Sequence, residues 1–108
     1  MKLDDVRAIK YGDVVVEGER WPNSIHVIEH PDGRVLVDTG MIDSTPELDA
    51  AWGIRFDPSL IPRDAVCVIN THLHFDHCGG NRLFAGTPIH VQRVEMAMMR
   101  TPDGHSRL

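Results

Sequence analysis

The first part of the chain carries short runs of β-branched and other apolar residues, separated by clusters of turn-forming residues. Residues 6–9 and 14–17 have strand character, and the Tyr-Gly-Asp cluster at residues 11–13 predicts a turn between them. Residues 24–29 and 34–38 flank the sequence His-Pro-Asp-Gly, in which proline followed by Asp-Gly is strong turn chemistry. The pattern therefore predicts short strands, the second pair of which forms a β-hairpin.

The pattern changes in the second half, where helical and strand signals alternate. A helix is predicted to begin at Thr45, which precedes Pro46 and Glu47, and to end at Gly53. An apolar run at residues 65–69 has the β-branched character of a buried strand and leads into a histidine-rich segment. The remaining sequence predicts a helix at residues 81–84, a strand at 88–91, a helix at 93–100 and a loose tail at 101–108. Strands followed by alternating strands and helices predict an α/β fold.

Length and composition limit the classes of function. The chain has 108 residues, of which 42% are hydrophobic and 25% charged, so we expect one globular domain. Sixteen acidic residues against 11 basic ones give a net charge of −5, which argues against a nucleic-acid partner. No apolar stretch approaches the ~18 residues of a membrane span, and the acidic start of the sequence does not resemble a secretory signal. Two cysteines without a Cys-x-x-Cys spacing agree with a reduced, cytoplasmic protein.

One segment stands apart because histidine is concentrated in it. The chain contains seven histidines, and His72, His74 and His77 lie within six residues together with Asp76. They follow directly on the predicted buried strand, and α/β proteins place ligands at the carboxyl ends of strands. His72 and His74 alternate and can share one metal ion, while Asp76 and His77 can reach a second. Imidazole and carboxylate groups suit zinc, and also iron, manganese or cobalt, so we interpret the segment as a metal site rather than a histidine-rich surface loop.

Two motifs carry a resemblance to a known family. Residues 71–81, Thr-His-Leu-His-Phe-Asp-His-Cys-Gly-Gly-Asn, resemble the metal-binding motif of metallo-β-lactamase fold hydrolases. Residues 34–40, Arg-Val-Leu-Val-Asp-Thr-Gly, resemble the earlier strand motif of that family, and the two motifs occur in the family's order. Within the superfamily the sequence is most similar to the N-acyl homoserine lactonase branch, because of its His-Pro-Asp-Gly turn and of residues 89–93 with Glu95.

The resemblance implies a role for each residue of the motif. His72 and His74 would bind a first divalent metal ion, and Asp76 and His77 a second, with zinc as the expected metal. Asp38 would be a supporting carboxylate that fixes the loop rather than a ligand. The implied reaction is the opening of an acyl homoserine lactone ring by a metal-bound hydroxide, with Asp76 as the catalytic residue that carries a proton to the leaving group. A thioester hydrolase of the glyoxalase II type is the alternative among enzymes.

The resemblance also implies that residues 1–108 form the N-terminal half of a metallo-β-lactamase αββα sandwich, built from β-hairpins followed by β/α units. The family's second half supplies the remaining metal ligands, and His90 and His105 follow the motif too closely to replace them. We therefore expect a fragment of a longer enzyme, or a chain completed by a copy of itself or by another chain. A catalytically inactive metal-binding half-domain is the third possibility, so the activity of this chain alone is left open. The expected partner of the complete enzyme is a small ester or lactone substrate.

Overall fold

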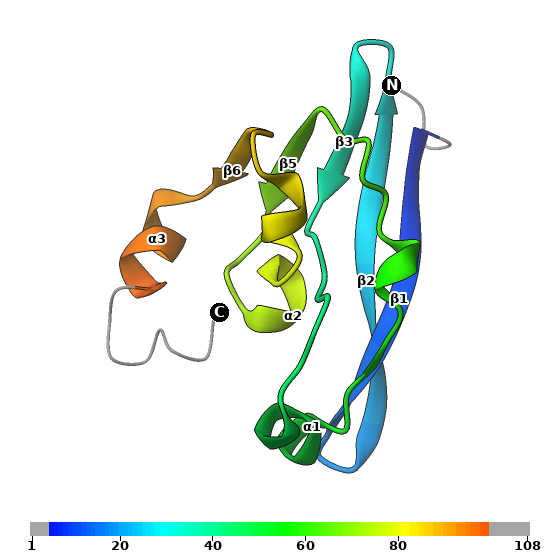
Figure 1. Ribbon diagram of the computed structural model, residues 1–108, viewed down its shortest axis with the longest axis vertical. Coiled ribbons are helices and arrows are strands. Elements are labelled where there is room, and N and C mark those ends of the chain that lie inside the picture. Colours follow the sequence, from blue (N-terminus) through cyan, green and yellow to red (C-terminus); the bar gives the residue numbers. More distant parts are fainter. Residues whose placement is uncertain (1–4, 100–108) are drawn as a thin grey trace.

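The computed structural model describes residues 5–99, which form a six-stranded mixed sheet with short helices (Figure 1). The strands are β1 (Val6–Val16), β2 (Glu19–His30), β3 (Gly33–Val37), β4 (Arg55–Phe56), β5 (Cys67–Asn70) and β6 (Ile89–Val91). The helical elements are α1 (Pro46–Trp52), η2 (Pro58–Leu60), α2 (Phe75–Cys78), η3 (Asn81–Phe84) and α3 (Arg93–Met99). Across the sheet the order is β4-β1-β2-β3-β5-β6, which confirms the α/β class. The tail predicted at residues 101–108 lies outside the described residues.

β1 and β2 form a long antiparallel hairpin in which β1 contains a β-bulge. The pairing register shifts between Lys10 and Gly12, so Tyr11 is an additional residue in the strand. The predicted turn at residues 11–13 is therefore wrong, because β1 continues through it. The glycine has another use, since a Cβ atom at Gly12 would lie 2.3 Å from the carbonyl oxygen of Arg55. Its missing side chain allows the short strand β4 to pair with β1.

The remaining strands bring two loops together at one edge of the sheet. β2 and β3 pair antiparallel across the His-Pro-Asp-Gly turn, which confirms the predicted hairpin. β5 pairs parallel with β3, and β6 parallel with β5. Val37 near the end of β3 lies beside Ile69 near the end of β5, so both strands finish at the same edge. The loop that begins with Asp38 therefore meets the histidine-rich loop that begins with Thr71.

α1 begins and ends as its sequence predicts. The Leu48 backbone N–H donates a hydrogen bond to the Thr45 hydroxyl at 3.2 Å, and Pro46 is the first helical residue. Gly53 ends the helix in a left-handed backbone conformation. The helix lies against β1 (Figure 1). Its Leu48 and Trp52 side chains line the same pocket as residues at the end of that strand. Within residues 5–99, no helix has the length and apolar character needed to cross a membrane.

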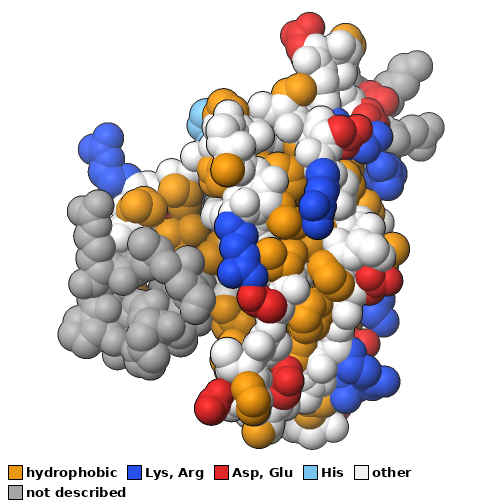
Figure 2. Space-filling view, viewed as in Figure 1, with side chains coloured by type: hydrophobic (Ala, Val, Ile, Leu, Met, Phe, Trp, Pro, Cys, Tyr) orange, Lys and Arg blue, Asp and Glu red, His pale blue; other side chains and the backbone are white. Residues whose placement is uncertain are grey.

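The core lies on one face of the sheet. Tyr11, Ile25, Val27, Leu36 and Val68 come from the strands, and Met41, Ile61, Ala65 and Phe84 pack over them from loops and η3. Charged side chains of both signs are scattered around hydrophobic ones on the face viewed in Figure 2. On the other face of β5, the side chain of Ile69 is 40% exposed. The apolar run at residues 65–69 is thus buried on one face only, although parallel strands are normally covered on both.

Candidate metal centre

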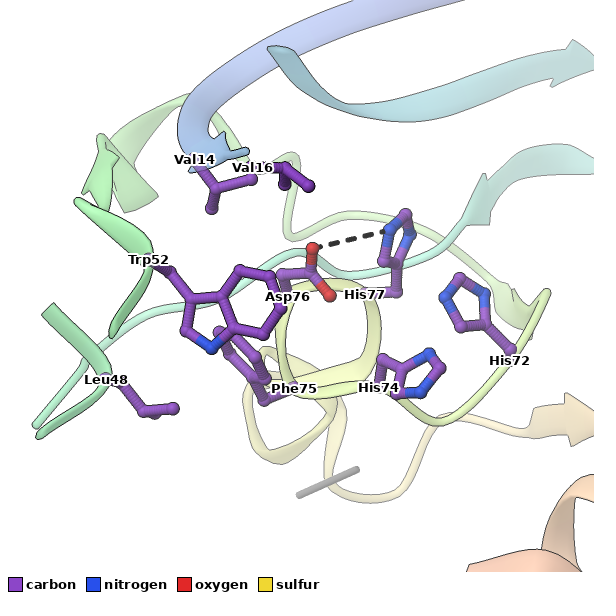
Figure 3. A pocket seen from close by; sticks show the side chains of 9 residues that line it. All are labelled: Val14, Val16, Leu48, Trp52, His72, His74, Phe75, Asp76 and His77. Carbon is purple, nitrogen blue, oxygen red and sulfur yellow. Dashed lines mark ion pairs between the residues drawn. The ribbon is translucent and has the colours of Figure 1, made fainter. Parts of the chain in front are cut away.

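The four residues that the sequence singles out line one pocket. His72 and His74 precede α2, and Asp76 and His77 lie on it, so a single loop after β5 carries all four. The pocket has a volume of about 450 Å³, and Figure 3 shows the three imidazole rings and the Asp76 carboxylate beside one another. The ring centroid of His72 is 4.8 Å from that of His74 and 4.2 Å from that of His77. Oδ2 of Asp76 lies 3.7 Å from Nε2 of His77.

Asp38 holds this loop from the end of the neighbouring strand β3. Its Oδ1 accepts a hydrogen bond from the Thr71 backbone N–H at 2.8 Å, and its Oδ2 accepts one from the Thr71 hydroxyl at 2.7 Å. The same Oδ2 lies 3.0 Å from Nδ1 of His77. Asp38, His72 and His77 each offer a potential ligand atom within 4.8 Å of the others. Through these hydrogen bonds Asp38 supports both His77 and Thr71.

Hydrogen bonds to Nδ1 fix the orientation of two of the imidazole rings. The contact with Asp38 uses Nδ1 of His77, which leaves Nε2 on the side of Asp76. The Thr71 hydroxyl oxygen lies 2.9 Å from Nδ1 of His72 and constrains that ring in the same way. Metal-binding histidines are usually oriented by a partner on the nitrogen that does not bind the metal. The Nε2 atoms of both rings are therefore the nitrogens that can act as ligand atoms, with that of His77 beside the Asp76 carboxylate.

Burial and neighbouring charges shift the pKa values of three groups in the metal-free site. Burial alone would raise the pKa of Asp38, but hydrogen bonds, the strongest of them with His77, lower it below the usual range. Burial opposes the protonation of His77, yet the hydrogen bond with Asp38 and the charges of Asp76 and Asp38 raise its pKa. The pKa of His72 is lowered by burial and by the neighbouring charges of His77 and His74. The shifts favour an ion pair between Asp38 and His77 and a neutral, metal-competent His72.

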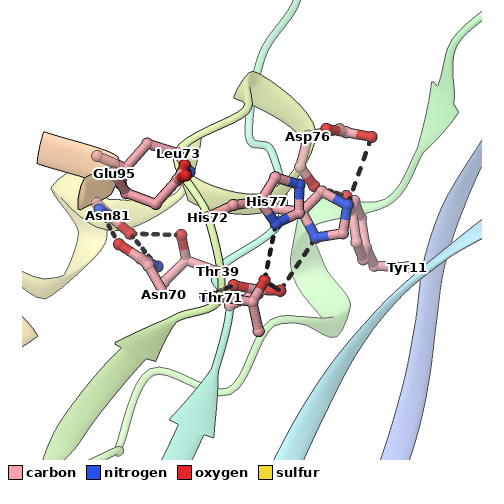
Figure 4. A network of polar contacts seen from close by, with 11 residues as sticks. Tyr11, Thr39, Asn70, Thr71, His72, Leu73, Asp76, His77, Asn81 and Glu95 are labelled. Carbon is pink, nitrogen blue, oxygen red and sulfur yellow. Dashed lines mark hydrogen bonds and ion pairs between the residues drawn. The ribbon is translucent and has the colours of Figure 1, made fainter. Parts of the chain in front are cut away.

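Tyr11, the extra residue of the bulge in β1, reaches α2, the helix that carries Asp76 and His77. Its buried hydroxyl donates a hydrogen bond to the backbone carbonyl oxygen of Asp76 (Figure 4). Burial, followed by the negative charges of Asp76 and Asp38, raises the pKa of the Tyr11 hydroxyl, so it remains a donor. Its ring also packs on Gly40, where an added Cβ atom would lie 3.0 Å from the ring. No sequence pattern points to a site role for this residue, because a hydrogen bond from a side chain to a distant carbonyl leaves no periodic signal.

Further contacts fix the loop on the side of β5 and α3. Glu95 on α3 accepts a hydrogen bond from the Leu73 backbone N–H at 3.0 Å. The side chains of Asn70 and Asn81 pair with each other across the two ends of the loop (Figure 4). The sequence drew attention to Asn81 and Glu95 only as parts of family-like motifs, and it gave no role to Asn70. A buried asparagine at the end of a strand was the one available signal for it.

The wall of the pocket opposite the rings is apolar. Val14 and Val16 come from β1, Leu48 and Trp52 from α1, and Phe75 from α2 (Figure 3). The rings of Trp52 and Phe75 lie 6.3 Å apart. Polar groups gathered at one side of an otherwise apolar pocket suit a ligand with a polar reacting group and an apolar tail.

The residues of the loop fit a divalent cation. Three imidazoles and a carboxylate are the donors that zinc, iron, manganese and cobalt accept in proteins. The hydrogen bonds of His72 and His77 supply the orientation that such ligands need. The loop also packs tightly enough to hold its shape, since a Cβ atom at Gly80 would lie 2.3 Å from the carbonyl oxygen of Thr39. Donor chemistry and support therefore both agree with a metal centre.

Comparison of the sequence with known proteins gives consistent matches. Residues 18–103 match the family model of the Metallo-beta-lactamase superfamily. N-acyl homoserine lactonase AiiA of Bacillus thuringiensis subsp. kurstaki is 34% identical over 90 residues, a match that covers 65% of this chain and 36% of the lactonase. The matched part thus represents about a third of that curated relative.

Solved structures match nearly all of the chain. An N-acyl homoserine lactone hydrolase with the product N-hexanoyl-L-homoserine at its catalytic metal centre has a TM-score of 0.73 and 27% identity, covering 95% of this chain and 53% of that one. A probable metal-dependent hydrolase from Staphylococcus aureus has a TM-score of 0.74 at 18% identity, covering 99% of this chain and 54% of that one, a likeness of fold alone. The chain therefore spans about half the length of these structures, and the fold expected from its motifs is confirmed.

Proposed function

Because the chain belongs to the metallo-beta-lactamase superfamily, we propose that it is the ligand-bearing N-terminal half of a metal-dependent hydrolase that opens the ring of N-acyl homoserine lactones. The observation that carries this proposal is the position of His72, His74, Asp76 and His77 together in one pocket with an apolar wall. The matched relatives named as N-acyl homoserine lactonases support a lactone as the substrate.

Each member of the loop has one role in this proposal. His72 and His74 hold one divalent ion, and Asp76 and His77 hold a second, with zinc as the first choice and iron, manganese or cobalt as alternatives. Asp38 orients His77 and does not bind the metal. Catalytic zinc usually has about three protein ligands and a water molecule. Each ion would therefore need further ligands from outside this loop.

The chemistry requires a polarised carbonyl group, an activated water molecule and a protonated leaving group. A divalent cation bound here supplies Lewis acidity toward the carbonyl oxygen and lowers the pKa of a water molecule. The Asp76 carboxylate, beside His77 at the pocket, can take a proton from the attacking water and deliver it to the ring oxygen when the acyl–oxygen bond breaks. Tyr11 holds the backbone of Asp76 in place for this transfer. The apolar wall takes the acyl chain and excludes water from that side.

We also propose that residues 1–108 form one half of the complete domain. The solved structures that match nearly all of this chain are about twice as long. Apolar side chains such as Val6 and Ile69 are exposed on the face of the sheet opposite the core. A second αβ layer, in the same polypeptide or in another chain, would cover this face and supply the remaining ligands.

Metal binding is the first point to test, and native mass spectrometry with added zinc reports it together with the assembly state. We expect zinc to bind, and the exchange His74→Ala to weaken binding. The exchange His26→Ala removes an exposed histidine on β2 and serves as the matched control. Wild-type protein that takes up no more zinc than the His74→Ala variant would contradict the proposed metal centre.

Hydrolysis is tested with a polypeptide that also contains the second layer. Opening of N-hexanoyl homoserine lactone releases a carboxylic acid, which a pH-stat measures directly. We expect hydrolysis by the zinc-loaded protein and by its His30→Ala variant, which lacks an exposed histidine beside the turn between β2 and β3, and loss of activity in the His74→Ala variant. Cleavage of a glutathione thioester instead of the lactone would favour the glyoxalase II type. Tight zinc binding without cleavage of either substrate would contradict both proposed hydrolase activities.

A further inference from the structure

We propose that the paired side-chain amides of Asn70 and Asn81 position the ligand loop before a metal ion binds. They hold together the two ends of this loop, which we call its neck. The loop comprises residues 71–80, which include His72, His74, Asp76 and His77. Asn70 is the last residue of β5, and Asn81 is the first residue of η3. The inference deepens the proposed function, because it concerns how the same metal centre is arranged.

The geometry of the pair is reciprocal. Nδ2 of Asn70 donates to Oδ1 of Asn81 at 3.2 Å, and Nδ2 of Asn81 donates to Oδ1 of Asn70 at 2.7 Å. Asn70 is only 2% exposed, so its amide has little access to water as a replacement partner. Figure 4 shows the two amides facing each other at the base of the loop. Two hydrogen bonds between the same side chains fix both the distance and the relative orientation of the loop ends.

A third residue ties this neck to the sheet. The Thr39 hydroxyl donates to Oδ1 of Asn81 at 2.8 Å, and the Thr39 backbone N–H donates to the carbonyl oxygen of His77 at 2.9 Å. The Gly80 backbone N–H also donates to the carbonyl oxygen of Gly40 at 3.2 Å. The closed neck therefore lies against the segment that follows β3, the same segment that contributes Asp38.

Amide groups suit this position for a chemical reason. Each amide can donate and accept at once, whereas a carboxylate can only accept and an aliphatic side chain can do neither. Closing a flexible loop costs conformational entropy. To bind a metal well, the ligand atoms must be held within about 0.5 Å of their binding geometry. An amide pair at the neck closes the loop within the protein, so metal binding does not have to offset the entropy cost of closing it. Asn70 and Asn81 would then act on metal binding through the histidines, without contact with the ion.

Hydrogen exchange in the metal-free protein tests the neck directly. The Thr71 and Gly80 amide protons report on the two ends of the loop, because they bond to Asp38 and Gly40. We expect Asn70→Ala and Asn81→Ala each to accelerate their exchange at least about tenfold, the effect of losing hydrogen bonds from a buried pair. The variant with both substitutions should add little to either one, since each already breaks the pair. Amide exchange is followed by NMR in the presence of a chelator.

A control separates positioning from loss of stability. Ile61→Ala removes a buried apolar side chain of the core outside the loop. Urea unfolding measures the free energy of unfolding of this variant and of the asparagine variants. Their amide exchange rates can then be compared at equal stability. Exchange at Thr71 and Gly80 that rises no more in the asparagine variants than in Ile61→Ala would overturn the proposal. So would fully additive effects in the doubly substituted chain.

Zinc affinity supplies a second readout that is independent of hydrolysis. Competition with a chromophoric chelator should show at least about tenfold weaker binding in Asn70→Ala and Asn81→Ala than in Ile61→Ala, a loss typical of outer supports of metal ligands. Unchanged affinity would overturn the link between the neck and the metal. If wild-type protein binds no zinc, the proposed function fails, while the exchange experiment still decides whether the pair closes the loop.

Discussion

Asp38 shows how a single side chain links two strands to a candidate metal ligand. It follows β3 directly and has a φ of 65°, a backbone conformation that aspartate tolerates better than most residues. From there its carboxylate contacts both Thr71 at the start of the ligand loop and His77 on α2. One residue thus sets the position of the loop and the orientation of one imidazole.

The exchange Asp38→Asn tests this supporting role, because it preserves the shape of the side chain and removes its charge. We expect zinc affinity to fall about 10- to 100-fold, the usual effect of losing an outer partner of a metal-binding histidine. Chelator competition measures the change. Asp32→Asn, on the exposed turn between β2 and β3, is the matched control and should leave affinity unchanged. Equal affinity in the Asp38→Asn variant and the wild type would show that the carboxylate is dispensable.

The ion pair between Asp38 and His77 also predicts how stability depends on pH in the metal-free protein. The raised pKa of His77 gives stability that is present below its ordinary pKa and is lost as pH rises through the raised value. The lowered pKa of Asp38 gives stability that is present above the ordinary carboxyl range and is lost as pH falls through the lowered value. His72 acts in the opposite sense to His77, since its lowered pKa costs stability as pH falls below its ordinary value.

Urea unfolding with a chelator, from about pH 5 to pH 9, checks this prediction across the range in which histidine titrates. The difference in unfolding free energy between wild type and Asp38→Asn should be largest at the acidic end, where His77 is protonated and Asp38 is ionised. It should shrink as pH rises through the pKa of His77. A difference that grows over this interval would contradict the ion pair.

At the scale of elements, the ligand loop depends on close backbone contact with the segment after β3. A Cβ atom at Gly80 would lie 2.3 Å from the Thr39 carbonyl oxygen, a contact that only movement of the backbone can relieve. We therefore expect Gly80→Ala to lower the free energy of unfolding by ~2–4 kcal/mol and to weaken zinc binding. Urea unfolding and chelator competition measure the two effects.

Gly86 provides the matched control for this substitution. A Cβ atom there meets nothing within 4 Å, and its φ of 85° makes alanine costly only through the backbone, by about 1 kcal/mol. Gly86→Ala should leave zinc affinity unchanged. If both alanine variants lose the same stability and keep the same affinity, the close approach at Gly80 does not shape the site.

Local sequence signals predicted some elements well and others poorly, for identifiable reasons. The capping residues Thr45 and Gly53 set the ends of α1, because caps act through neighbouring residues alone. Gly12 and Asp13 indicated a turn but lie inside β1, where pairing with β2 and β4 outweighs local preference. The histidine motif located the pocket. The contact of Tyr11 with Asp76 was not predictable, because it joins residues that only the folded sheet brings together.

At the scale of the whole molecule, the described residues 5–99 cover the sheet on one face only. The apolar run at residues 65–69 predicted a buried strand, yet only one face of β5 is covered: Val68 is fully buried, whereas Ile69 on the opposite face is 40% exposed. Hydrophobic pattern reports the burial that a segment attains in its complete domain, and this chain spans about half the length of the solved structures it matches. The proposed second layer would cover the exposed face of this strand, and the burial would then agree with the hydrophobic pattern.

Substitution of Ile69 tests whether that face is covered in a longer protein. In the 108-residue chain, Ile69→Ser should change the unfolding free energy by less than ~1 kcal/mol, because the side chain is already 40% exposed. Val68→Ser, on the covered face, should cost ~2–4 kcal/mol in the same chain. In a polypeptide with the second layer, the cost of Ile69→Ser should rise by ~1–3 kcal/mol. Equal costs in both polypeptides would show that nothing packs on this face.

The bulge in β1 has a consequence for insertions and deletions. Because Tyr11 is an extra residue between two regular stretches of pairing, removing its codon would leave both stretches in register with β2. Deleting a residue elsewhere in the strand would instead shift the register of one stretch by one residue. Its side chains would then move to the opposite face of the sheet, since side chains alternate between faces. The tyrosine that supports the backbone of Asp76 can therefore be gained or lost in a single genetic step without rebuilding the sheet around it.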